Sequence, residues 1–131
     1  MRREPNWIDK RALLFLHAES LAEFGGASGI RDEGLLESAL ARARNLQAYE
    51  PKCKLADLAA AYCHGLVKNH PFVDGNKRAG FLAIGLVLEI NGYTLAADPV
   101  DAIGAILSVA AGELSAEDLA RWIAAHIERA S

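Results

Sequence analysis

The sequence feature that most constrains the fold is an apolar run over residues 79–88, which begins directly after a charged segment. This run is too short to cross a bilayer, which takes about 20 residues of helix. It therefore predicts a buried core helix over about Asn76 to Asn91, terminated by Gly92. A helix that is apolar nearly all round belongs at the centre of a fold, and we expect neighbouring helices to pack closely on Gly80 and Gly85.

Helical periodicity recurs through most of the remaining chain. The clearest series, Leu55 to Val67, follows i, i+3, i+4, i+7 spacing and predicts a helix that ends near Asn69, before Pro71. Asp32 and Ser115 are placed to cap helix starts. The other expected helices span residues 7–24, 32–44, 99–111 and 115–129, with a short extended piece over 93–96. The apolar stripe of the first of these is predicted to contain Leu13, Leu14, His17, Leu21 and Phe24.

Composition bounds the class of protein. The chain has 131 residues, of which 52% are hydrophobic, and it shows no internal repeat or linker. These features predict a single all-α domain over residues 1–131. The net charge of −3 argues against a general nucleic-acid binder, which neutralises many phosphates with basic residues.

Location and redox chemistry follow from the same composition. We expect a cytoplasmic protein without membrane association, because neither a signal-peptide pattern nor a spanning helix is evident. The two cysteines are too few for a disulfide framework. Cys63 lies among apolar residues and is expected to be a buried thiol.

Residues 70–78, His-Pro-Phe-Val-Asp-Gly-Asn-Lys-Arg, are not explained by packing alone. The backbone N–H groups in the first turn of a helix lack intrahelical partners, and the helix dipole makes that end attractive to anions. Gly75 allows close approach to the backbone, and Asn76 can cap the helix or donate to a phosphate oxygen. Lys77 and Arg78 oppose the dipole there, a conflict that an anionic ligand would resolve. The segment therefore predicts a nucleotide-phosphate site.

The same segment offers groups for metal binding and proton transfer. Asp74 is its only carboxylate, which suits Mg²⁺ held together with substrate phosphates. His70 is the candidate general base for an attacking hydroxyl, while Pro71 and Phe72 would fix the turn. Two structural alternatives stay open. Asp74 could simply pair with Arg78, and His70 could simply end the preceding helix, where the dipole favours it.

These residues closely resemble the signature HxFx(D/E)xNxR of the Fic/Doc family, here carried by His70, Phe72, Asp74, Asn76 and Arg78. Further similarity to the Doc branch extends over residues 24–32, 35–40, 76–80 and 111–115. The resemblance implies an all-α Fic fold of about six helices around the central helix that follows the motif. It also implies roles: His70 deprotonates the target hydroxyl, Asp74 holds Mg²⁺ on the nucleotide, and Asn76 and Arg78 hold phosphates.

One motif position separates the branches of the family. Fic members that transfer AMP usually have glycine after the motif Asn and a second arginine three residues after the first, where this chain has Lys77 and Phe81. The Doc branch has the lysine and binds ATP in the reversed direction. The resemblance therefore implies a protein Ser/Thr kinase that transfers the γ-phosphate of ATP, with adenylyltransferase as the alternative.

The resemblance also implies partners. Doc-type members are toxins that act on elongation factor Tu, arrest translation, and are inhibited by an antitoxin whose C-terminal segment is disordered until it binds. The family's internal inhibitory motif is missing here, so an external antitoxin is expected. The candidate flap that guides the target comprises Gly25, Gly26, Ser28, Gly29 and Arg31, although a plain interhelical turn is the alternative.

A rival function from another class is a non-catalytic module that binds the antitoxin and serves as a co-repressor. The other histidines do not favour further chemistry. His126 and His64 lie on or near helical stripes and are expected to be half-buried structural residues, whereas His17 could border the cleft. The histidines and cysteines lack the spacing of zinc ligands.

Overall fold

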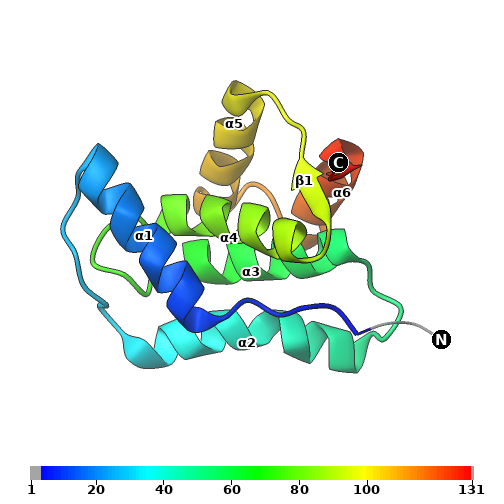
Figure 1. Cartoon of the computed structure of the whole chain (residues 1–131), viewed down its shortest axis with the longest axis horizontal. Helices are drawn as coiled ribbons and strands as arrows, with labels where there is room; N and C mark the ends of the chain where they lie inside the picture. Colours follow the sequence, from blue (N-terminus) through cyan, green and yellow to red (C-terminus); the bar gives the residue numbers. More distant parts are fainter. Residues whose placement is uncertain (1–3, 131) are drawn as a thin grey trace.

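The computed structural model describes residues 4–130 (Figure 1). Within that range the chain forms six helices and two short strands. The helices are α1 (Lys10–Phe24), α2 (Glu33–Tyr49), α3 (Leu55–Asn69), α4 (Asn76–Ile90), α5 (Pro99–Ala110) and α6 (Ala116–His126), and the strands are β1 (Tyr93–Leu95) and β2 (Ile127–Arg129). This mostly helical arrangement confirms the predicted all-α fold class.

Short polar side chains set the starts of several helices. Asp32 accepts a hydrogen bond from Leu35 N at 2.9 Å, and Ser115 Oγ accepts one from Asp118 N at 3.1 Å, so both expected caps are confirmed. Asp9 caps α1, which is why that helix begins at Lys10 rather than at residue 7.

Two predicted helix ends were wrong. Helix α2 continues past residue 44 to Tyr49, because nothing before Pro51 interrupts its hydrogen bonding. Helix α6 stops at His126 instead of reaching residue 129. The chain there becomes β2, which pairs antiparallel with β1 through Tyr93–Arg129, Thr94–Glu128 and Leu95–Ile127. The backbone groups of residues 127–129 are satisfied by this pairing rather than by helix.

Helices α3 and α4 form the centre of the fold, where α3 contacts α2, α4 and α6 (Figure 1). A Cβ on Gly80 would lie 2.6 Å from Val67 Cγ2 and 3.1 Å from Cys63 Sγ, so α3 and α4 pack as closely as predicted at this position. The same expectation was wrong for Gly85, where a Cβ would meet nothing within 4 Å. Gly85 shares the exposed side of α4 with Phe81, which is 42% exposed.

The first helix also departs from the expected stripe at one end. Leu13 and Leu21 are buried, but Phe24 is 67% exposed at the last turn of α1. Cys63 is fully buried, as predicted, and burial raises the pKa of its thiol to about 12. Within the described range, no helix is long and apolar enough to cross a membrane.

Candidate active site

The segment from His70 to Gly75 connects α3 to α4 and lies against the glycine-rich loop that connects α1 to α2, at one end of the molecule (Figure 1). An isolated antiparallel bridge joins Ile30 to Phe72. Val73 N donates to Gly29 O at 3.0 Å, and Arg31 N donates to Pro71 O at 2.7 Å. The glycine-rich loop is therefore attached to the motif by backbone hydrogen bonds.

His70 occupies an unusual backbone conformation at the end of α3. Its φ of 53° and ψ of 54° are left-handed, and among residues 4–130 it alone has a positive φ without being glycine. Two hydrogen bonds from one guanidinium hold this turn: Arg31 Nε donates to His70 O at 2.7 Å, and Arg31 Nη2 donates to Asn69 O at 3.1 Å. His70 is exposed to solvent at this turn.

Asn76 supports the motif from inside. Its side chain is 4% exposed; Oδ1 accepts from Phe72 N at 2.9 Å and Nδ2 donates to Phe72 O at 3.0 Å. The prediction that Asn76 could cap α4 was wrong, because Gly75 occupies the N-cap position with a φ of 74°. Asn76 therefore closes the turn around Phe72. A contact between its side chain and a phosphate stays a prediction.

His17 supports the same loop from α1. The side chain is 4% exposed, and its ring stacks on that of Phe72 with centroids 3.8 Å apart. Nε2 lies 2.9 Å from Asp74 O. A carbonyl oxygen only accepts, so Nε2 must carry the ring proton. A Cβ on Gly75 would lie 3.1 Å from His17 Nε2, which together with the positive φ explains why glycine occupies this position.

The Asp74 carboxylate is held by two backbone N–H groups. Oδ1 accepts from Gly75 N at 2.8 Å, and Oδ2 accepts from Ala27 N at 3.2 Å. These hydrogen bonds, first that from Gly75 and then that from Ala27, lower the pKa of Asp74 below its ordinary value of 3.8. No ion pair joins Asp74 to Arg78 in the portion of the chain that the structure describes. Asp74 is thus an ionised, solvent-exposed carboxylate at neutral pH.

The amino end of α4 lacks the usual compensation for its dipole. Neither a side-chain cap nor an acidic residue is present in its first turn. Over residues 4–130, no acceptor pairs with the backbone N–H groups of Asn76, Lys77 or Arg78. The Lys77 side chain is exposed, and no partner for it occurs within those residues. Three backbone donors and one ammonium group therefore surround this helix end.

Arg78 extends from the same turn toward the carboxyl end of α1. Its Nη1 donates to Ser20 O at 3.4 Å and to Gly25 O at 3.3 Å, and its guanidinium lies 5.5 Å above the Phe24 ring. The Nε and Nη2 groups have no acceptor among the described residues. They remain able to bind an anion.

This donor set fits a polyphosphate with a magnesium ion. One exposed carboxylate leaves most of a Mg²⁺ coordination sphere to phosphate oxygens and water, as that ion prefers. The unpaired N–H groups and the cations of α4 suit phosphate oxygens. The exposed imidazole of His70 lies just before this cluster along the chain.

Comparison with known proteins agrees with the motif. Residues 7–88 match the Fic/DOC family. The chain belongs to the Fic/DOC family. A curated relative, Toxin Doc from Mycolicibacterium smegmatis, is 45% identical over 84 residues, which are 63% of this chain and 64% of that protein. The match spans slightly less than two thirds of the relative, and it supports the resemblance to the Doc branch.

The predicted motif residues lie between the end of α3 and the first turn of α4, and the structure adds supporting contacts that sequence patterns did not identify. His17 does not border an open cleft, as was considered, but lies buried beneath the motif. A polar residue on the apolar stripe of α1 was the signal that could have identified it. Arg31 was predicted only as part of a flap, yet its guanidinium braces His70.

The flap itself stays a prediction. Its glycines contact the motif, since a Cβ on Gly26 would lie 3.0 Å from Asp74 Oδ2 and one on Gly29 would lie 3.4 Å from Val73 Cγ2. The loop is thus more than a plain interhelical turn, because its backbone helps to hold the motif.

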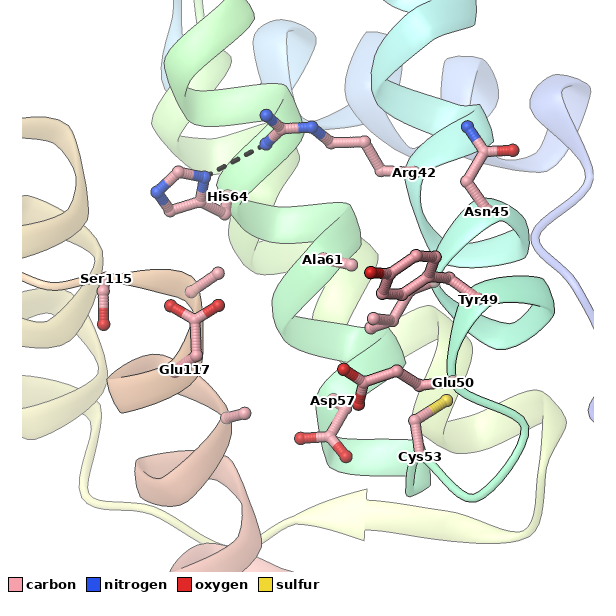
Figure 2. A pocket seen from close by; sticks show the side chains of 13 residues that line it. Arg42, Asn45, Tyr49, Glu50, Cys53, Asp57, Ala61, His64, Ser115 and Glu117 are labelled. Carbon is pink, nitrogen blue, oxygen red and sulfur yellow. Dashed lines mark hydrogen bonds between the residues drawn. The ribbon is translucent and has the colours of Figure 1, made fainter.

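The two remaining histidines are half-buried, as predicted. His126 Nδ1 lies 2.7 Å from Trp122 O. His64 borders a groove of about 820 Å³ between α2, α3 and α6, where Arg42 Nη1 lies 3.1 Å from its Nδ1 (Figure 2). Tyr49, Glu50 and Glu117 also line this groove, which contains no residue of the motif.

Proposed function

We propose that the protein is a Doc-type toxin that transfers the γ-phosphate of ATP to a serine or threonine hydroxyl of a target protein, with elongation factor Tu as the expected target. The observation that carries the proposal is the amino end of α4, which has no side-chain cap, with Lys77 and Arg78 in its first turn and His70 before it. The name of the 45% identical relative, Toxin Doc, supports the toxin role.

In this proposal, His70 accepts the proton of the target hydroxyl as the hydroxyl oxygen attacks the γ-phosphorus. The new O–P bond forms while the bond from the γ-phosphorus to the β,γ-bridging oxygen breaks, and ADP leaves with that electron pair. The N–H groups of Asn76 and Lys77 and the side chains of Lys77 and Arg78 hold the phosphates. Asp74 would hold Mg²⁺, which when bound neutralises phosphate charge.

Lys77 favours one of the two transfer reactions that the family resemblance implies. Lys77 stands at the position where AMP-transferring members usually have glycine. Phe81 stands where those members have a second arginine. A lysine beside the helix end favours a polyphosphate terminus at this place through its point charge. We therefore favour phosphoryl transfer over AMP transfer.

The toxin role implies a cognate antitoxin. In this proposal the antitoxin contributes a C-terminal segment that is disordered when free and orders on the toxin, which suits reversible regulation. Co-purification of the chain with its genomic neighbour, followed by limited proteolysis of that partner alone and in the complex, tests this part. Protection of the partner's C-terminal segment only in the complex is expected, and equal cleavage in both samples would contradict it.

The chemical proposal is tested with ATP labelled at the α or the γ phosphate, together with Mg²⁺ and elongation factor Tu. We expect label from the γ position alone, lost in His70→Ala and retained in the matched control His126→Ala, whose histidine lies outside the motif. Label from the α position would make the protein an adenylyltransferase. No label from either position, with growth arrest unaffected by His70→Ala, would support the non-catalytic co-repressor instead.

A further inference from the structure

His17 is a buried ionisable group that the proposed chemistry does not use. It lies on α1, 57 positions before Asp74, one of the two motif residues that it contacts, and is 4% exposed. A histidine in such a place could merely fill the core. Its two contacts are more specific than that, because one is a ring stack on Phe72 and the other is a hydrogen bond to Asp74 O.

The hydrogen bond from His17 determines the orientation of one peptide group. The carbonyl of Asp74 and the N–H of Gly75 belong to the same planar unit and point in opposite directions across it, since no described peptide bond is cis. When His17 Nε2 binds the carbonyl, the Gly75 N–H is directed to the other side. There it donates to Asp74 Oδ1 at 2.8 Å.

We propose that His17 is a positioning residue that orients the Asp74 carboxylate through the Asp74–Gly75 peptide group. This inference rests on the proposed function only in taking Mg²⁺ as the ion that the carboxylate binds. The stack on Phe72 supplies rigidity, because it fixes the imidazole plane from which Nε2 donates. Groups that orient a ligating side chain from outside its immediate shell commonly change metal affinity by about 10- to 100-fold when removed.

Two substitutions separate the hydrogen bond from the packing. His17→Phe keeps an aromatic ring against Phe72 but removes the donor. His17→Gln removes the ring but places an amide N–H near the position of Nε2. If His17 only fills the core, the phenylalanine variant should resemble wild type more closely than the glutamine variant does. If His17 positions the Asp74–Gly75 peptide group, the glutamine variant should resemble wild type more closely.

The first readout needs no nucleotide. In ¹⁵N-labelled full-length protein, the Gly75 amide is expected to change its chemical shift and exchange faster with solvent in His17→Phe, and to stay close to wild type in His17→Gln. The wild-type imidazole must be the Nε2–H tautomer, which its ¹⁵N shifts report without any variant. A Nδ1–H tautomer, or a Gly75 amide indifferent to the loss of the donor, would overturn the proposal.

The second readout is the Mg²⁺ concentration that gives half-maximal label transfer from γ-labelled ATP. We expect it to rise about tenfold in His17→Phe, with the rate at saturating Mg²⁺ close to wild type, and to change little in His17→Gln. Equal losses of thermal stability in both variants with an unchanged Mg²⁺ midpoint would indicate a core histidine only. If the wild-type protein transfers no label, the proposed function fails, and the Gly75 amide still decides the role of His17.

Discussion

The guanidinium of Arg31 donates to the carbonyl oxygen of His70 at 2.7 Å, and so links the glycine-rich loop to the backbone of the proposed general base. Its second donor, Nη2, binds Asn69 O at the carboxyl end of α3, where a cation is also favoured by the helix dipole. The left-handed conformation of His70 is thus stabilised by a residue 39 positions earlier in the chain.

Replacing Arg31 with methionine tests this link. We expect Arg31→Met to lower the free energy of unfolding by about 1 kcal/mol. We also expect label transfer to slow by about tenfold or more, because a small displacement of the His70 base from its reactive position lowers the rate strongly. Chemical denaturation and the transfer assay measure the two effects. Arg31→Lys keeps the charge but not the two-pronged geometry, so full activity in that variant would contradict the argument.

The backbone strain at His70 has a separate consequence. A residue with a Cβ costs about 1 kcal/mol or more in the left-handed region, whereas glycine adopts it freely. His70→Gly is therefore expected to be more stable than His70→Ala by about 1 kcal/mol, while both variants lose label transfer. Denaturation curves of the two proteins make the comparison. Greater stability of the alanine variant would show that the turn relaxes when the imidazole is removed.

The two glycines of α4 provide a matched pair for packing. Gly80→Ala places a methyl group 2.6 Å from Val67 Cγ2, and we expect a loss of about 1–3 kcal/mol in unfolding free energy. Gly85→Ala meets nothing within 4 Å and is expected to gain about 0.5–1 kcal/mol from helix propensity. Thermal or urea unfolding measures both. Equal effects at the two sites would contradict the close contact of α3 with α4.

Removal of the Lys77 side chain tests the preference for γ-phosphate transfer. Lys77→Gly should reduce γ-label transfer by about tenfold, the loss of one charge-assisted contact of about 1.4 kcal/mol. Lys77→Ala separates the missing charge from the added backbone freedom, and the two variants should behave alike. Unchanged γ-label transfer by folded Lys77→Gly would remove the reason for preferring a kinase.

His64 predicts a dependence of stability on pH. Burial first, and then the charges of Arg42 and Lys68, lower the pKa of His64 below 6.5, while Glu117 acts in the opposite direction. The unfolded chain therefore binds a proton at a higher pH than the folded chain does. The stability that comes from the lowered pKa of His64 is present in full above about pH 6.5 and is lost as the pH falls. Thermal midpoints between about pH 7.5 and 5.5 should fall less in His64→Gln than in wild type.

Local sequence patterns determined the helices and the identity of the motif. Apolar spacing in α3 and the caps Asp32 and Ser115 involve residues no more than a few positions apart, so these features can be predicted from the sequence. The cluster at residues 70–78 was recognisable for the same reason, because its chemistry is contiguous. The end of α6 was not predictable locally, since β2 forms only where β1 lies beside it.

The tertiary structure alone decided which distant residues hold the motif segment. His17 and Arg31 act on the motif from positions 57 and 39 residues away, and no local rule relates such distant side chains. Gly80 and Gly85 look alike in sequence, yet of the two only Gly80 lies so close to another helix that a Cβ would contact it. From the sequence, Asn76 could have been the N-cap of α4 or a phosphate-binding residue. In the structure the N-cap is Gly75, one residue earlier, which has a left-handed backbone conformation. Helix propensity and capping are properties of neighbours in sequence, whereas orientation of a reactive group depends on contacts that exist only after packing.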